Sequence, residues 1–159
     1  MRRIAFLCPG QGAQHVGMGQ DVRDAFPTAR RTFEEVDEAL GEPLSSLCFD
    51  GPEERLVLTE NTQPALLATS VAIGRVLLEE SGRRPVLAAG HSLGEWSALV
   101  LAGAIDLGSA ARAVRDRGRF MQQAVAPGEG AMSALLGVDA ARVEQLCAAA
   151  SDPATGEVV

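Results

Sequence analysis

Residues 86–103 read VLAAGHSLGEWSALVLAG, an apolar run, a serine between glycines and a second apolar run. The first run is typical of a short buried strand and the second of a helix. Between them, Gly90-His91-Ser92-Leu93-Gly94 fulfils the pattern G-x-S-x-G, in which a serine sits on a sharp turn from strand to helix. The glycines on either side let the backbone pass closely. This stretch predicts a strand, a sharp turn and a helix. The turn is expected to expose Ser92 as a nucleophile, and the alternative is a turn with a structural role only.

Similar signals predict further elements along the chain. The predicted strands cover residues 4–8 and 85–89, and the predicted helices cover 28–40, 63–80, 93–103 and 106–125, with a short one opened by Pro52. On the helix over 63–80, the predicted core stripe is Leu66, Leu67, Ser70, Ile73, Leu77 and Leu78. Strands that alternate with helices indicate an α/β fold with a parallel sheet.

A proline- and glycine-rich stretch, APGEG at 126–130, is expected to separate two units. The main unit covers residues 1–125. A smaller unit, expected to be truncated, covers 126–159. Within it the sequence predicts a strand over 131–138, a helix over 139–150 and the start of a strand at 156–159.

The composition excludes several classes of function. The net charge of −7 argues against nucleic acid or an anionic membrane as a partner. All fourteen basic residues are arginine, which excludes a Schiff-base lysine and a phosphate-binding Walker lysine. Cys8, Cys48 and Cys147 are far apart, as are the two histidines, so no metal site and no cofactor are expected. With no membrane span and no signal-peptide pattern, we expect a cytoplasmic protein with reduced thiols.

The glycine-rich loop after the first strand, PGQGAQHVGMG at 9–19, does not fit a nucleotide-binding loop. The G-x-G-x-x-G pattern would need a glycine where His15 stands. A Walker loop would need Lys followed by Ser or Thr after Gly17, where Met18 and Gly19 stand. In an enzyme with a nucleophile on such a turn, this loop supplies the second backbone donor of the oxyanion hole.

The helix over 106–125 carries four arginines, which helical spacing divides into two groups. Arg112, Arg115 and Arg119 cluster on one side and are predicted to form a solvated face. Arg117 lies on the other side, in an apolar stripe predicted to contain Ala110, Ala113, Val114, Phe120, Met121 and Ala124. A buried guanidinium needs an anion. The partner of Arg117 is therefore either an Asp or Glu of the protein or the carboxylate of a substrate.

Four segments together resemble the malonyl-CoA:acyl carrier protein transacylases of fatty acid and polyketide synthesis. They are FLCPGQGAQHVGMG at 6–19, LTENTQPALLATS at 58–70, GHSLGEWSALVLAGAI at 90–105, and VRDRGRFMQQAV with GEGAMSALLG at 114–137. The resemblance covers nearly the whole chain. It implies an α/β-hydrolase-like large subdomain with an inserted ferredoxin-like small subdomain, of which residues 126–159 would be the beginning.

The resemblance also implies roles for five residues. Ser92 would be the acylated nucleophile and Arg117 would bind the malonyl carboxylate. The backbone N–H groups of Gln11 and Leu93 would form the oxyanion hole, and Gln63 would lie near the acyl group. Malonyl-CoA would be the substrate and acyl carrier protein the acceptor.

The family's catalytic histidine has no counterpart in this sequence. Neither His15 nor His91 occupies its motif, and for His91 an orienting or packing role is expected, because it points away from the serine. Family members are roughly twice as long. We therefore expect a truncated chain that is a poor catalyst alone and needs a complementary C-terminal half.

Two other functions remain open from the sequence. The first is a serine hydrolase or thioesterase on a related fold, which a carboxylate-binding Arg117 would disfavour. The second is a non-catalytic fragment that binds a carrier protein or a complementary half without turnover.

Overall fold

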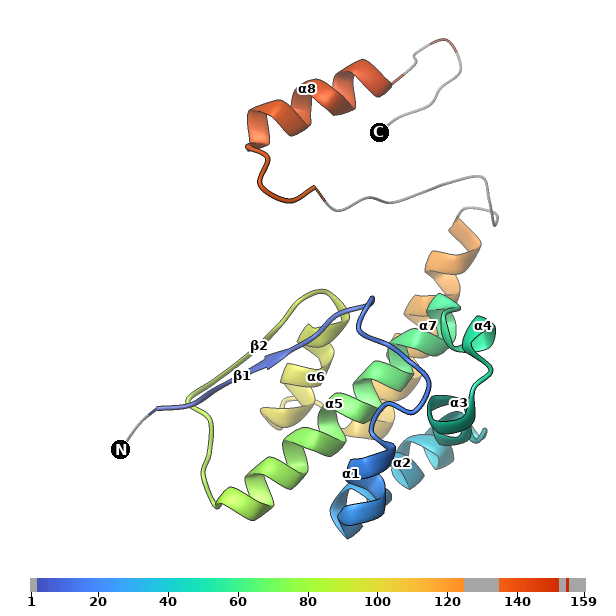
Figure 1. Cartoon of the computed structure of the whole chain (residues 1–159), viewed down its shortest axis with the longest axis vertical. Coiled ribbons are helices and arrows are strands. Elements are labelled where there is room, and N and C mark those ends of the chain that lie inside the picture. Colours follow the sequence, from blue (N-terminus) through green and yellow to red (C-terminus); the bar gives the residue numbers. More distant parts are fainter. Residues whose placement is uncertain (1–2, 125–134, 152–153, 155–159) are drawn as a thin grey trace. The chain divides into compact units, whose positions relative to one another are not determined.

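The computed structural model describes residues 3–124, 135–151 and 154. The chain divides into two compact units, Met1–Ala126 and Pro127–Val159. In the first unit (Figure 1) the elements are β1 (Ala5–Cys8), α1 (Gln20–Ala25), α2 (Pro27–Leu40), α3 (Leu44–Asp50), α4 (Glu53–Leu56), α5 (Thr59–Ser81), β2 (Leu87–Gly90), α6 (Leu93–Leu101) and α7 (Leu107–Ala124). The described part of the second unit holds α8 (Ala140–Ala150).

The two strands lie side by side as a parallel pair (Figure 1), with Ala5 opposite Leu87 and Cys8 opposite Gly90. Parallel strands need a long crossover, which α1–α5 provide. The α/β class predicted from the sequence is thereby confirmed, although helices dominate the described residues. Because the strands are parallel, the glycine-rich loop after β1 and the turn after β2 emerge at the same edge of the sheet.

The core lies mainly among the helices. The long helix α5 packs against α2, α6 and α7, and it is buried along most of its length. Phe33 of α2 meets Phe49 of α3 edge to face, with ring centroids 4.9 Å apart. Leu93 and Val114 complete this core from α6 and α7.

Most of the elements predicted for the first unit are confirmed, with ends shifted by a few residues. The short helices α1 and α3 were not predicted, since six or seven residues carry too little periodicity to stand out. None of the described helices is both long and apolar enough to cross a membrane.

The core stripe predicted for α5 is partly wrong. Leu66 and Leu67 are buried, but Ile73 and Leu77 are exposed. The helix is surrounded on several sides, so small residues such as Ala68 and Ala72 are buried in their place. Ile73 and Leu77 instead line a groove of about 550 Å³ between α5 and β1.

This groove leaves one side of β1 uncovered within the described chain. It is lined by the whole of β1 and by Leu66, Ile73 and Leu77 of α5. Leu7, in the middle of β1, is 80% exposed. An apolar strand residue this exposed is typical of a surface that packs against further structure.

The second unit contains the helix predicted over 139–150. Its first turn is capped by Asp139, whose side chain accepts a hydrogen bond of 2.8 Å from the backbone N–H of Arg142. The strand predicted over 131–138 is not found in residues 135–138, and residues 131–134 lie outside the described residues. The strand predicted at 156–159 also lies outside them.

Candidate active site

Ser92 lies on a strained turn between β2 and α6. Its φ of 53° and ψ of −107° make it, among the described residues other than glycine, the one with a positive φ. A Cβ on Gly90 would lie 2.0 Å from the carbonyl carbon of Gly94, and one on Gly94 would lie 2.2 Å from the carbonyl oxygen of Cys8. Only glycine fits at both positions. The sharp turn predicted from the G-x-S-x-G pattern is present, and it exposes Ser92 to solvent.

Arg117 reaches this serine from α7. One terminal nitrogen of its guanidinium donates a hydrogen bond of 3.0 Å to Oγ of Ser92, and the other donates one of 2.7 Å to Oε1 of Gln63. Gln63 is fully buried on α5, and its Nε2 lies 3.2 Å from Sδ of Met121. The fold thus brings together Ser92, Arg117 and Gln63, which are far apart in the sequence.

The charge of Arg117 has no carboxylate partner among the described residues. Both of its hydrogen-bond acceptors, on Gln63 and Ser92, are neutral oxygens. Within that part of the chain, the alternative of a protein ion pair is not realised. A half-buried guanidinium beside an exposed serine hydroxyl can accept an anionic ligand.

The prediction that Arg115 belongs to a solvated face is wrong. Arg115 is 5% exposed and pairs with Glu42, and it donates a hydrogen bond of 2.5 Å to Oδ1 of Asn61. Burial is the main cause that lowers the pKa of its guanidinium below the usual value, and the charge of Arg119 adds to it. Arg112 and Arg119 are exposed, as predicted.

The apolar stripe predicted around Arg117 is also partly wrong. Phe120 is 70% exposed, and Met121 and Ala124 are exposed too. The buried positions of α7 are Leu107, Ala110, Ala111, Val114, Arg115 and Gly118, at the three- and four-residue spacing of a packed helix. The apolar residues of the last turns shifted the predicted stripe toward Arg117, which in fact lies at the rim of the buried face.

Gln11 and Leu93 lie on the two segments that follow the strands. Leu93 is the first residue of α6 and is buried. The side chain of Gln11 donates a hydrogen bond of 3.1 Å to Oγ1 of Thr59, the first residue of α5. This bond links the glycine-rich loop to the helix that carries Gln63.

The two histidines lie apart from these contacts. His91 is exposed and packs beside Gly10, where an added Cβ would lie 2.7 Å from the carbonyl oxygen of His91. His15 is exposed in the glycine-rich loop. Among the described residues, no group of three or more His, Cys, Asp or Glu side chains could hold a metal ion.

Two residues that contact the site, Thr59 and Met121, were not assigned to it from the sequence. Thr59 holds Gln11, and no local pattern indicates this. Met121 contacts Gln63, and it stands four residues after Arg117, so helical spacing alone places both side chains near one face of α7.

Comparison with known proteins shows which family this chain is similar to. A model of the acyl transferase domain matches residues 5–155. The malonyl CoA-acyl carrier protein transacylase of Bacillus subtilis strain 168 is 53% identical over 146 residues, which are 92% of this chain and 46% of that protein. These matches confirm the resemblance indicated by the four sequence segments.

Solved structures agree with this result. The malonyl CoA-acyl carrier protein transacylase of Coxiella burnetii matches with a TM-score of 0.90 and 45% identity, over 94% of this chain and 48% of that one. A chain from the structure of a type II PKS acyl-carrier protein in complex with its malonyl-transacylase matches with a TM-score of 0.87 and 49% identity, over 93% and 48%. The chain spans about half the length of the relatives it matches.

Proposed function

Because the chain belongs to the acyl transferase domain family, we propose that it carries the nucleophile and the acyl-binding arginine of a malonyl transferase. The reaction moves a malonyl group from coenzyme A to the phosphopantetheine thiol of an acyl carrier protein. The observation that carries this proposal is the contact between Arg117 and Ser92, at 3.0 Å, with no protein carboxylate on Arg117 within the described residues. A guanidinium in that position matches the free carboxylate that distinguishes malonyl from simple acyl groups.

The proposed reaction has two transfer steps. Oγ of Ser92 attacks the thioester carbonyl, a base takes the hydroxyl proton, and the C–S bond to coenzyme A breaks to leave a malonyl ester on Ser92. The base passes this proton to the departing thiolate of coenzyme A. The thiol of the carrier protein then attacks the ester and loses its proton to the base, the C–O bond to Ser92 breaks, and the base passes that proton to Oγ. The strained backbone at Ser92 supports the proposal because it holds Oγ out from the turn.

The backbone N–H groups of Leu93 and Gln11 are proposed to bind the oxyanion formed in each step. Leu93 begins α6, so its N–H belongs to the positive end of that helix. The bond from Gln11 to Thr59 supports a fixed position for the glycine-rich loop. Gln63 is proposed to hold the guanidinium of Arg117 so that it faces the acyl group.

The groove between β1 and α5 is proposed to be covered by the rest of the acyltransferase fold, which would also supply the general base. Relatives are about twice as long, and the groove exposes apolar residues of a strand. We extend the proposal to the α/β-hydrolase-like architecture, with residues 126–159 as the beginning of a ferredoxin-like subdomain. A cytoplasmic location completes it, supported by the three free cysteines Cys8, Cys48 and Cys147.

Mass mapping after incubation with malonyl-CoA tests the nucleophile. In an assembly that completes the fold, the malonyl mass should lie on the peptide that contains Ser92. It should vanish in Ser92→Ala and persist in Ser97→Ala, a matched control whose serine is buried in α6, the helix that follows Ser92. Label on a cysteine that survives Ser92→Ala would rule out the proposed ester, and rapid hydrolysis without transfer to a carrier thiol would favour a thioesterase.

A further inference from the structure

The arginine predicted to face solvent, Arg115, stands two residues before Arg117 and is buried. We propose that Arg115 is a positioning residue: it fixes the rotation of α7 on α5 and so holds Arg117 at Ser92. The expected effect of Arg115 on substrate choice rests on the proposed function. Its expected effect on the position of Arg117 does not.

The two helices touch backbone to backbone at Gly118. A Cβ there would lie 2.6 Å from Cα of Glu60 and 2.7 Å from the carbonyl oxygen of Thr59. Side chains therefore cannot separate α7 from α5 at this point. Such a contact fixes the distance between the two helices at this point, and the contacts on either side of it determine how far one helix can roll on the other.

The two arginines leave α7 on opposite sides of this contact. At about 100° per residue, Arg115 lies about 60° to one side of Gly118, and Arg117 lies about 100° to the other. The same spacing on α5 places Asn61 and Gln63 on opposite sides of Glu60. The bonds from Arg115 to Asn61 and from Arg117 to Gln63 thus bridge the helices on two flanks.

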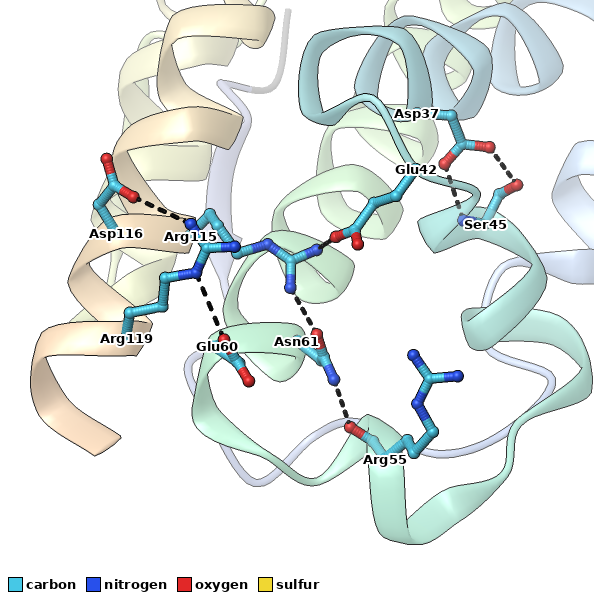
Figure 2. Close-up of polar contacts among 9 residues, drawn as sticks. All are labelled: Asp37, Glu42, Ser45, Arg55, Glu60, Asn61, Arg115, Asp116 and Arg119. Carbon is cyan, nitrogen blue, oxygen red and sulfur yellow. Dashed lines mark hydrogen bonds and ion pairs between the residues drawn. The ribbon is translucent and has the colours of Figure 1, made fainter. Parts of the chain in front are cut away.

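The flank with Arg115 is held by a network of polar contacts, which Figure 2 shows. Arg115 contacts both Glu42 and Asn61. The amide nitrogen of Asn61 donates a hydrogen bond of 2.7 Å to the carbonyl oxygen of Arg55, which fixes the direction of its amide oxygen toward Arg115. Arg119 adds a weaker contact of 3.4 Å to Glu60 on the same flank.

The flank with Arg117 has no ion pair among the described residues, because its guanidinium contacts only neutral oxygens, one on the buried Gln63 and one on the exposed Ser92. A roll of about 10° moves a group about 6 Å from a helix axis by about 1 Å. A misplacement of about 1 Å can cost on the order of 100-fold in rate. Loss of the Arg115 anchor is therefore expected to weaken the hold of Arg117 on Ser92 and on an acyl carboxylate.

The first test measures the position of Arg117 without any turnover. In Arg115→Met the rate at which phenylglyoxal modifies Arg117, followed by peptide mass mapping, should rise about fivefold over the unchanged chain. Arg119→Met is the matched control, because Arg119 lies on the same flank but is exposed, and it should leave the rate within about twofold. Arg115→Lys keeps the charge beside Glu42, so its rate of modification at Arg117 should lie between the rates of these two variants.

The second test measures substrate choice in an assembly that completes the fold. Arg115→Met should lower the ratio of kcat/KM for malonyl over acetyl thioesters about tenfold, with the acetyl reaction changed less than about threefold. A merely structural role would lower both reactions alike. If Arg115→Met does not fold, Glu42→Gln decides, because Glu42 is partly exposed and its loss loosens Arg115 alone; it should raise the modification rate of Arg117 about twofold.

The outcomes separate this inference from the proposed function. An unchanged modification rate for Arg117 in a folded Arg115→Met, or in Glu42→Gln if that variant alone folds, would overturn the positioning role. A chain that forms no malonyl ester on Ser92 in the completed assembly would overturn the proposed function, while the modification rates would still decide the role of Arg115.

Discussion

Arg115 and Arg117 are separated by one residue on α7, yet their surroundings differ in every respect that matters for a charge. Arg115 is almost fully buried, and a carboxylate from Glu42 neutralises it. Arg117 is half-buried, and its partners are the neutral oxygens of Gln63 and Ser92. The difference shows that α7 carries two kinds of arginine. The charge of Arg115 is neutralised by a carboxylate of the protein, whereas Arg117 faces an exposed serine hydroxyl and has no carboxylate partner within the described chain.

At Gly118, between the flanks that carry the two arginines, the backbones of α7 and α5 touch. A substitution that pushes the two helices apart there should have the largest effect on stability. In Gly118→Ala the new methyl group would meet backbone atoms of α5, and overpacking of this kind should lower the free energy of unfolding by about 3 kcal/mol. Gly108→Ala is the matched control in the same helix. Its Cβ would lie 3.4 Å from the nearest side chain, so urea unfolding should show no loss and a gain of up to about 1 kcal/mol.

Replacement of Arg115, the arginine paired with Glu42, should have the next largest effect on the free energy of unfolding. Arg115→Met leaves Oδ1 of Asn61 without its donor, which should lower the free energy of unfolding by about 2 kcal/mol. The carboxylate of Glu42 is 45% exposed and can be hydrated, so the loss stays below that of a fully buried ion pair. Arg119→Met should change stability by less than about 0.5 kcal/mol. Equal urea midpoints for the two variants would show that the Arg115 flank is not the anchored one.

The flank of α7 that carries Arg115 lies next to α3, which contains the buried Cys48. Because of this thiol, we expect the stability to fall at alkaline pH. Burial, and secondarily Asp37, raises the pKa of this thiol from 9.0 to about 12. Above pH 9 the unfolded chain loses the proton that the folded chain keeps, so the free energy of unfolding should fall by about 1 kcal/mol between pH 9 and pH 10. The chain has no lysine or tyrosine to mask the effect, although Cys8 adds to it in the same direction.

Unfolding by urea at a series of pH values measures this slope. Cys48→Ala should flatten most of it, whatever the mutation does to stability at pH 7. A slope that is unchanged in Cys48→Ala would assign the effect to other groups.

The smallest effect on stability is expected when Arg117, which has no carboxylate partner within the described chain, is replaced. In Arg117→Met the oxygen of the buried Gln63 loses its donor, but the cost of holding a half-buried guanidinium with no carboxylate partner among the described residues is removed at the same time. The free energy of unfolding should therefore change by only about 0.5 kcal/mol, measured as for Arg115→Met. A loss as large as that of Arg115→Met would mean that both flanks serve the fold.

The sequence alone predicts the segment around Ser92 well, because close backbone approach leaves a strong pattern. Only glycine fits at Gly90 and Gly94, and apolar runs flank them on both sides. The family resemblance implied that Arg117 and Ser92 belong to one site, but their direct contact was not predicted. Local spacing could not predict it, because it depends on how α7 crosses α5.

The burial of Arg115 was missed for the same physical reason. Helical spacing gives directions relative to an apolar stripe, and Phe120 and Met121 displaced that stripe. The true contact line is set by Gly118, a residue that carries no hydropathy signal. On α5, Ile73 and Leu77 were assigned to the core because hydropathy does not distinguish a buried face from an uncovered groove.

Substrate choice in Arg117→Met tests most directly whether the unneutralised arginine receives the carboxylate of the acyl group. The measurement is kcat/KM for malonyl and acetyl thioesters, in an assembly that completes the acyltransferase fold. Loss of a charge-assisted contact of about 2–4 kcal/mol should lower the malonyl value about 30- to 1000-fold, while the acetyl value falls less than about threefold. Equal losses for the two thioesters would contradict the assignment of Arg117 to the substrate carboxylate.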